Sequence, residues 1–378
     1  MNNNFITYGS FFAENPSRTP DYKMDTRGVL TYNTEKAFNG YTLFSRGSGD
    51  HFYLIDMEGN VIHSWEIKNS SIHFGELTPE GHLLYATTDR TIEKGRGIYE
   101  LTWEGDLVWY YPCPVDHDHI LLENGNVLIL CREEIIDPRV RKPLWPDYRA
   151  AFSPYMIEVD KNKKILWEWH GNKHTVELQE LAGLTFPREG NELDRDRDWA
   201  HCNTCSPLPE NESGRADPRF KKGNILFSYR ELDTIGIIDK VTGNIVWAWG
   251  PGEIMGQHKP VMLENGNILL FDNGLHSSER KRGYSRILEV NPLKSTIEWE
   301  YKASPPEDFY SPYVSNQQKL PNGNVLICSG NQGRIFEVTG DKEIVWDYHN
   351  QFCNREGRGG LYRHSGRYSR DFIEPFLK

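Results

Sequence analysis

The sequence has no long apolar run. None of its stretches approaches the roughly 18 consecutive apolar residues that a membrane-spanning helix needs, so we expect no membrane span. Its first residues, MNNNFITYGSFFAENPSR, lack both the basic start and the apolar core of a secretory signal. These two absences predict a soluble, cytoplasmic protein.

The chain also has few cysteines, and its net charge is negative rather than positive. Six cysteines among 378 residues do not make a disulfide framework. Cys202 and Cys205 form a CxxC pair without a second pair at zinc-ribbon spacing, and we interpret both as ordinary thiols. The net charge of −11, with acids and bases interspersed, argues against nucleic acid as a partner. It leaves room for a locally basic pocket that binds a small anion.

Turn-forming and aromatic residues are abundant instead. The chain contains 33 glycines and 21 prolines, and 12% of its residues are aromatic. This composition suits a turn-dense β fold better than a helical one. The apolar content of 38% is enough for a sizeable core, so we expect either two ordinary domains or one large all-β domain of repeated units.

A repeat of several strands runs through the chain. Tryptophan-bearing strands recur at Trp65, Trp109, Trp167, Trp247, Trp299 and Trp346. Glycine turns that open an apolar strand accompany them, clearest in ENGNVLIL (123–130), ENGNILLF (264–271) and PNGNVLIC (321–328). Asn-Gly supplies the positive φ angles of a tight hairpin, and a third strand ending in an acid, as in RILEV (286–290), follows. Six such units predict an all-β fold, a six-bladed β-propeller with loop insertions.

The repeat divides the chain into three parts. We expect a short N-terminal extension over 1–30, the propeller over 31–350, and a C-terminal tail over 351–378 that closes or caps it. The tail contains LYRHSGRYSRDF (361–372), which we interpret as a ring-closing strand rather than a substrate site. Insertions near 142–155, 173–198 and 210–222 are expected to wall the mouth of the central channel.

Three histidines stand eight residues before the glycine of a turn. They are His73, His117 and His258, which precede Gly81, Gly125 and Gly266. This position lies at the start of the innermost strand of a blade, so copies from different blades should meet at the propeller axis. The spacing therefore predicts a histidine-lined site in the channel.

The other three blades are less regular at this position. His201 occupies the comparable place in the fourth blade, which has an insertion before its turn. The last blade has Ser315 there, and the first has Tyr32. Four blades of six thus offer a histidine, although each one taken alone is also consistent with an ordinary surface or core residue.

Arginines form a second set of candidates. Arg132 and Arg230 stand seven residues after a turn glycine, and Asn273 holds the same place in the fifth blade. Guanidinium groups bind oxyanions with several donors at once, so a ring of His and Arg suits a sulfate, phosphate or carboxylate. Salt bridges to the neighbouring Glu133 or Glu231 are the structural alternative.

Several motifs resemble those of the bacterial arylsulfotransferase family. They are DWAHCNT (198–204), SYREL (228–232), GQHKP (256–260), FDNG (271–274), GYSRILEV (283–290) and DFYSP (308–312), and the resemblance runs from about residue 40 to 340. It implies a six-bladed propeller that moves a sulfuryl group from one phenolic ester to another phenol without a nucleotide sulfate donor. It also implies a channel histidine that is transiently sulfated, with further histidines and an arginine in support.

Carried over residue by residue, the resemblance assigns some of these roles. His201 and His258 match two of the family's channel histidines, and Arg280 or Arg282 lies where the family arginine follows FDNG, with His276 nearby. The family's covalent histidine is expected in the last blade, which has no histidine here and offers Arg334 or Ser315 instead. The sequence departs from the family at this point, so His117 or His73 becomes the candidate replacement nucleophile.

The predicted site then takes the following form. A neutral imidazole attacks sulfur, arginine and the other imidazoles stabilise the oxygens, and a histidine or Tyr310 moves the phenolic proton. The catalytic candidates are His73, His117, His201, His258, Arg230, Arg280 and Tyr310. The substrate-binding candidates are Arg132, Asn273, His276, Arg282, Ser315 and Arg334. We expect no required cofactor and a small anionic or aromatic substrate.

Three other interpretations stay open at this stage. His73, His117, His201 and His258 could hold Fe, Mn or Zn for an oxygenase or lyase. Histidine and Tyr310 could act without metal as base and acid of a polysaccharide lyase, with Arg holding a uronate carboxylate. A binding or scaffold propeller without chemistry is the third. The donor, the acceptor and the oligomeric state do not follow from the sequence.

Overall fold

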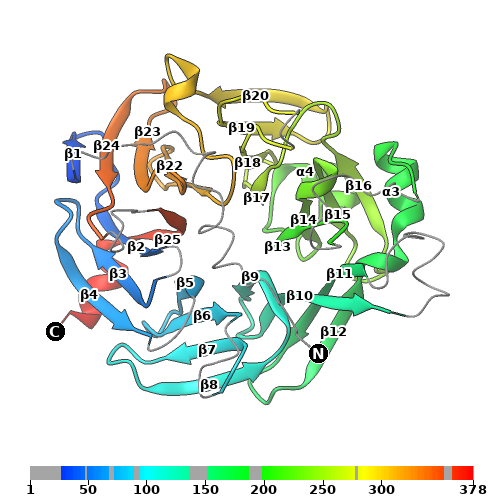
Figure 1. The fold of residues 1–378 in the computed structure, drawn as a ribbon, viewed down its shortest axis with the longest axis horizontal. Coiled ribbons are helices and arrows are strands. Elements are labelled where there is room, and N and C mark those ends of the chain that lie inside the picture. The colour runs from blue at the N-terminus through cyan, green and yellow to red at the C-terminus, as the bar shows by residue number, and fades with distance from the viewer. Residues whose placement is uncertain are drawn as a thin grey trace, which may run out of the picture.

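A computed structural model describes residues 27–46, 49–67, 72–88, 94–136, 151–186, 198–276, 280–352 and 360–377. Its strands form six antiparallel sheets, arranged as blades around a central axis (Figure 1). The predicted six-bladed propeller is confirmed. We number the blades in chain order and give the strands of each from the axis outward.

Blade 1 consists of β25 (Leu361–Ser369), β2 (Gly40–Arg46), β3 (His51–Ile55) and β4 (Val61–Glu66). Blade 2 consists of β5 (Ile72–Leu77), β6 (Leu83–Thr87), β7 (Gly97–Leu101) and β8 (Leu107–Pro112). Blade 3 consists of β9 (Val115–Leu121), β10 (Val127–Ile135), β11 (Ala151–Val159) and β12 (Ile165–His170).

Blade 4 consists of β13 (Cys202–Pro207), β14 (Ile225–Tyr229), β15 (Thr234–Ile238) and β16 (Ile245–Trp249). Blade 5 consists of β17 (His258–Met262), β18 (Ile268–Asp272), β19 (Arg286–Asn291) and β20 (Thr296–Tyr301). Blade 6 has five strands, β21 (Asn316–Lys319), β22 (Val325–Ser329), β23 (Arg334–Val338), β24 (Ile344–His349) and β1 (Gly28–Tyr32).

Both ends of the described chain close the ring. β25 supplies the innermost strand of blade 1, pairing with β2 from Gly40↔Ser369 to Arg46↔Leu361. β1 supplies the outermost strand of blade 6, where Tyr32 pairs with Trp346 of β24. The expectation that Tyr32 begins the inner strand of the first blade is therefore wrong, because that strand comes from the other end of the chain.

The core consists of six apolar layers, one between each pair of neighbouring blades. Phe52 of blade 1 packs with Tyr85 of blade 2, for example, and Leu269 of blade 5 clusters with Ile327 of blade 6. Each layer is sealed at its outer edge by the repeated tryptophan. The indole of Trp65 donates a hydrogen bond to the Thr102 carbonyl of the next blade, and five other tryptophans do the same in four further blades.

Short helices lie outside the blades. They are η1 (Gly171–Lys173), α3 (Thr175–Ala182), α4 (Glu212–Ala216), η2 (Pro218–Phe220), η3 (Arg230–Leu232), η4 (Pro306–Asp308), α5 (Arg370–Ile373) and η5 (Glu374–Phe376). Within the described ranges, no helix is long and apolar enough to cross a membrane.

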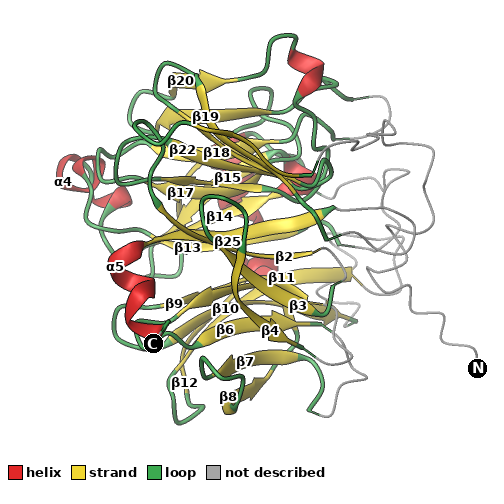
Figure 2. Ribbon diagram, turned by 90° about the vertical axis from the view of Figure 1, so that its left-hand side faces the viewer, coloured by secondary structure: helices red, strands yellow, loops and turns green. Residues whose placement is uncertain are grey.

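The described parts of two insertions do not wall the channel mouth as expected. α3 packs against the outermost strand of blade 4, β16, at the rim of the disc (Figure 1). α4 and α5 lie on one face of the disc (Figure 2). There Ser213 of α4 donates a hydrogen bond to the carbonyl of the turn glycine Gly266. This is the face at which the inner strands end, whereas their histidines stand where the strands begin. Residues 137–150 and 187–197 of the insertions lie outside the described residues.

Candidate active site

The innermost strands are irregular where they begin. In blades 1 to 5 the pairing between the first and second strand slips near this end, whereas β21 and β22 of blade 6 pair without a slip. Such bulges turn a side chain away from its regular direction and are common beside active sites. His201 stands at the entry to β13 with a φ of 44°, a conformation that few residues with a side chain adopt. The sequence pattern thus places its histidines at the least regular point of their blades.

Histidines from three blades gather there. The rings of His117 on β9 and His201 before β13 lie 4.7 Å apart, edge to face. Burial, followed by the charges of Arg230 and His117, lowers the pKa of His258 to about 3. Burial, followed by the charges of His117 and Arg230, also lowers the pKa of His201 well below its usual value. The four side chains are therefore electrostatic neighbours at the axis, and His201 and His258 are neutral at physiological pH.

One nitrogen of His258 is committed to the protein. The amide nitrogen of Asn273 donates to the carbonyls of Ser311 (2.7 Å) and Val314 (3.0 Å), so its Oδ1 faces His258 as an acceptor. Nδ1 of His258 lies 2.8 Å from this oxygen and 3.1 Å from the carbonyl of Gly256. Since both partners accept, Nδ1 carries the proton. The neutral ring consequently keeps its lone pair on Nε2.

His117 and His201 each have an aspartate partner. Nδ1 of His117 lies 3.0 Å from Oδ1 of Asp116. Burial alone would raise the pKa of Asp116, but the charges of His117 and Arg132 outweigh it and lower that pKa. Oδ2 of Asp198 lies 3.7 Å from Nδ1 of His201 and 3.5 Å from Nη1 of Arg132. Burial raises the pKa of Asp198 to about 6. The centre thus contains one carboxylate that stays ionised and one that holds its proton more tightly than usual.

Arg230 is buried beside these histidines. It pairs with Glu231, as the structural alternative predicted, and Nη2 donates to the Leu275 carbonyl over 3.4 Å. Its guanidinium carbon lies 5.4 Å from the centre of the Tyr313 ring. Its charge contributes to the lowered pKa of both His201 and His258. A guanidinium in this place offers an oxyanion a positive charge next to a neutral imidazole.

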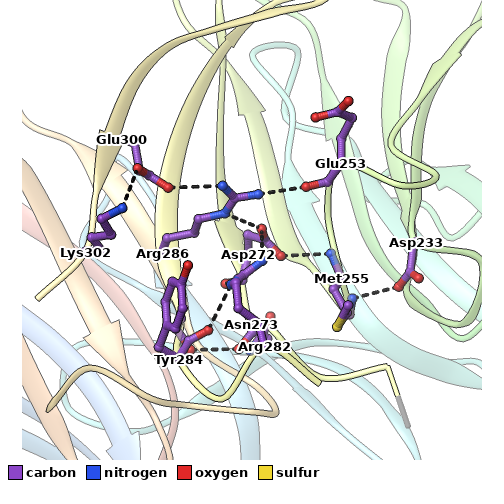
Figure 3. Close-up of polar contacts among 12 residues, drawn as sticks. Asp233, Glu253, Met255, Asp272, Asn273, Arg282, Tyr284, Arg286, Glu300 and Lys302 are labelled. Carbon is purple, nitrogen blue, oxygen red and sulfur yellow. Dashed lines mark hydrogen bonds and ion pairs between the residues drawn. The ribbon is translucent and has the colours of Figure 1, made fainter. Parts of the chain in front are cut away.

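Other candidates are each held by a carboxylate. Asp233 binds Arg280 (2.8 Å) and His276 (3.0 Å) and accepts a hydrogen bond from the nitrogen of Gly256. Arg282 lies 3.0 Å from Asp272, in a network with Arg286 and Glu300 that also supports the Asn273 loop (Figure 3).

The last-blade candidates are placed as follows. Arg334 begins β23, the third strand from the axis, and binds Asp347 over 2.7 Å. Ser315 is buried, and its hydroxyl bonds Ser311 and the nitrogen of Gly330. Tyr310 is half-buried, and burial raises the pKa of its phenol. His73 lies on β5, but its side chain is outside the described residues.

Some residues at the axis escaped sequence reasoning. Asp118 of β9 is fully buried beneath His117 and binds Lys259 of β17 over 2.7 Å and Arg363 of β25 over 3.3 Å. His364, beside Arg363, is also buried. The signal for Arg363 and His364 was present in the basic tail segment. The spacing rule does not reach these two residues, because their strand is not followed by the turn that defines the other positions.

Within the part of the chain that the structure describes, no three His, Cys, Asp or Glu side chains are grouped to hold a metal ion. His258 presents only Nε2 to the axis, and the side chain of His73 is not described. The four-histidine metal site stays a prediction.

Comparisons with known proteins agree with the fold and the motifs. A crystal structure of a protein of unknown function from Bacteroides caccae is 14% identical, with a TM-score of 0.54 over 86% of this chain and 98% of that one. A virginiamycin B lyase from Staphylococcus aureus is 11% identical, with a TM-score of 0.46 over 86% of this chain and 89% of that one. At these identities the likeness concerns the fold alone. A search of curated proteins finds no significant match.

A family model gives the more specific result. The model described as Arylsulfotransferase (ASST) matches residues 90–351, which is more than half of the chain. The matched range includes His117, His201, Arg230 and His258, the residues that meet at the axis. The chain therefore belongs to the arylsulfotransferase family.

Proposed function

We propose that the protein transfers a sulfuryl group between phenols, with Nε2 of His258 as the nucleophile. The observation that carries the proposal is the fixed tautomer of His258 beside Arg230. Nδ1 holds the proton against two acceptors, and the low pKa keeps the Nε2 lone pair available at neutral pH. This replaces the expectation that His117 or His73 takes over as nucleophile.

In the first half-reaction, Nε2 attacks the sulfur of an aryl sulfate. A nitrogen–sulfur bond forms as the bond between sulfur and the phenolic oxygen breaks, and that oxygen leaves with the bonding electron pair. The ring becomes a cationic N-sulfo adduct whose Nδ1–H still faces Asn273 and Gly256. Both acceptors stabilise the new positive charge. Arg230 stabilises the sulfuryl oxygens as negative charge builds on them.

The departing phenolate needs a proton, and the acceptor phenol must lose one. We assign both transfers to His117, which is paired with the ionised Asp116. An aspartate beside an imidazole orients the ring and stabilises its protonated form. His117 therefore gives its proton to the leaving phenolate and takes one from the incoming phenol. Tyr310, whose phenol pKa is raised, can serve as a donor but not as a base at neutral pH.

An aryl substrate also finds aromatic surface near the centre. The Tyr313 ring lies over Arg230, and the Phe152 ring lies 4.6 Å from the guanidinium carbon of Arg132. Rings placed beside charged groups suit a ligand that joins an aromatic body to an anionic end. The proposed reaction uses no metal, and metal analysis of the active protein checks this part of the proposal.

The test is the covalent adduct. The protein is incubated with a chromogenic aryl sulfate, quenched, digested and examined by mass spectrometry for a peptide heavier by one sulfuryl group. We expect this mass on the peptide that contains His258, and no adduct in H258A. The variant H63N, altered on outer strand β4, is the control and should label normally. An adduct on another histidine, or none with any aryl sulfate, contradicts the assignment.

A further inference from the structure

The C-terminal strand brings an arginine into the active centre. Arg363 of β25 is 4% exposed, and its guanidinium carbon lies 4.1 Å from the centre of the Phe74 ring. Nη1 lies 3.3 Å from Oδ1 of Asp118, and Nη2 donates to the carbonyl of His117. The family match ends at residue 351, so this strand lies beyond it. Arg363 is thus in direct contact with the backbone of a catalytic candidate.

Asp118 connects this arginine to the rest of the ring. Its carboxylate accepts from Lys259 Nζ (2.9 and 2.7 Å) and from the backbone nitrogen of Cys205 (3.0 Å). The carbonyl of Lys259 in turn accepts from Nε2 of Gln317 over 2.7 Å. Inner strands of blades 1, 3, 4, 5 and 6 are therefore joined across the axis just beneath the histidines. We call Asp118, Lys259 and Arg363 the floor of the centre.

We infer that Arg363 is a positioning residue of the active centre, which ties β25 to β9, the strand that carries His117. Three features support this role. The guanidinium bridges a side-chain carboxylate and a main-chain carbonyl on the same strand, so it sets where His117 stands. Arg363 also stands on an irregular part of β25, because the pairing of that strand with β2 slips between Leu43↔Gly366 and Phe44↔His364. Its charge also contributes to the lowered pKa of His258.

The inference rests on the proposed function for its catalytic meaning, but its structural content is measurable without turnover. Histidine side chains are labelled with ¹³C, and the Cε1–Hε1 signals of His117 and His258 are assigned by single substitutions and titrated. In R363M we expect the His117 signal to shift and the pKa of His258 to rise, because a positive charge that contributes to its lowering is lost. The kcat for aryl sulfate should fall about tenfold or more, with a smaller change in KM.

Two further variants separate positioning from general structure. R363K restores the charge without the two-pronged contact, so the His258 pKa should return while the His117 signal stays shifted. R219M is the matched control, because Arg219 also stacks on a phenylalanine and pairs with an aspartate, but on the surface of blade 4. It should leave both signals unchanged.

The inference is overturned if folded R363M shows His117 and His258 signals and pKa values identical to those of the unaltered protein. If R363M does not fold, R363K decides by the same His117 criterion. A protein that transfers no sulfate in any form removes the proposed function, yet the titrations still decide the placement of Arg363. Normal transfer with unaltered signals in the variants removes the inference alone.

Discussion

Asn273 decides which nitrogen of His258 carries the proton, because its own amide cannot turn over. Two main-chain carbonyls occupy its donors, so only its oxygen is left for the imidazole. The sequence predicts Asn273 in a ring of anion-binding candidates, and in the structure its side chain is bonded to His258 and to two carbonyls. In the proposed reaction it would act on the substrate through the histidine.

The variant N273A tests this task. Without the amide oxygen, Nδ1 of His258 keeps only the Gly256 carbonyl, and a larger share of rings turn their lone pair away from the axis. We expect kcat to fall about a hundredfold, within the range that a positioned proton-transfer group supplies. Steady-state kinetics with a chromogenic aryl sulfate measure it. N265A is the control, since Asn265 is in the same blade but bonds Glu289 in the distant turn. Equal kcat in the two variants contradicts the role.

Single residues show what the sequence hides. The sequence identifies His117 and His258 because each lies eight residues before a turn glycine, and it identifies His201 by its comparable place in the fourth blade and by the DWAH motif. Arg280 and Arg282 were candidates because they follow the FDNG motif, and Arg334 because the last blade has no histidine, yet each is bound to an aspartate. For Arg280 that aspartate is Asp233, which comes from the neighbouring blade. Partners brought together by tertiary structure leave no local trace, so the charge of a side chain is predictable and its availability is not.

At the scale of the element, the acid that ends each third strand has a shared purpose. Glu158 and Glu289 both accept hydrogen bonds from the two asparagines of their blade's ENGN turn. Glu158 also binds Lys240 of the next blade. The repeated turn asparagines and strand acids therefore reflect contacts that stabilise each blade and, at Glu158, join it to the next one. In blade 6 the same position, Glu337, binds Arg367 of β25 and completes the circle.

The Glu337–Arg367 pair should therefore contribute more to the free energy of unfolding than an exposed ion pair at the same junction. Both side chains are fully buried, so E337Q leaves a buried arginine without its counter-charge. We expect a loss of about 3–5 kcal/mol in the free energy of unfolding, measured by urea denaturation. E343Q breaks the exposed pair with Lys36 near the same junction, and the free energy of unfolding should fall much less, because water screens that pair. Similar losses of stability in both variants would contradict this role of the Glu337–Arg367 pair.

The blade repeat was predictable for a physical reason, and its closure was not. In blades 3 and 5 the inner strand and its turn are consecutive, so a fixed spacing marks the histidine. In blade 1 the turn glycine Gly40 opens β2, while the inner strand follows far along the chain. Counting eight residues back from Gly40 therefore leads to Tyr32 on the outer edge of blade 6. Spacing in the sequence describes a blade only where that blade is continuous.

For the whole molecule, buried neutral histidines set the response to acid. Burial lowers the pKa of His119 to about 4 and that of His258 and His364 to about 3, from the usual 6.5. Below pH 6.5 these histidines bind protons in the unfolded chain but stay neutral in the folded protein. These histidines thus contribute stability that is present above pH 6.5 and is lost as the pH falls towards 3. Each one steepens the loss by up to about 1.4 kcal/mol per pH unit.

The urea midpoint should accordingly drop between pH 7 and pH 4.5. In H364N the urea midpoint should depend less steeply on pH, because one of the histidines with a lowered pKa is gone. The same substitution at His51, a partly exposed residue of β3, is the control for the change of residue type. An unaltered slope in H364N means that His364 takes up its proton in the folded protein.

Ring closure also sets the moment at which activity begins during synthesis. Thr42 and Arg367, bonded to each other in blade 1, stand 325 residues apart. A ribosome needs on the order of tens of seconds to cover that distance, and throughout it β2 has no partner on its inner side. An unpaired edge of this kind invites pairing with other chains. We therefore expect nascent chains to be inactive until β25 emerges, and we expect the unpaired inner edge of β2 to be where they pair with other chains most readily.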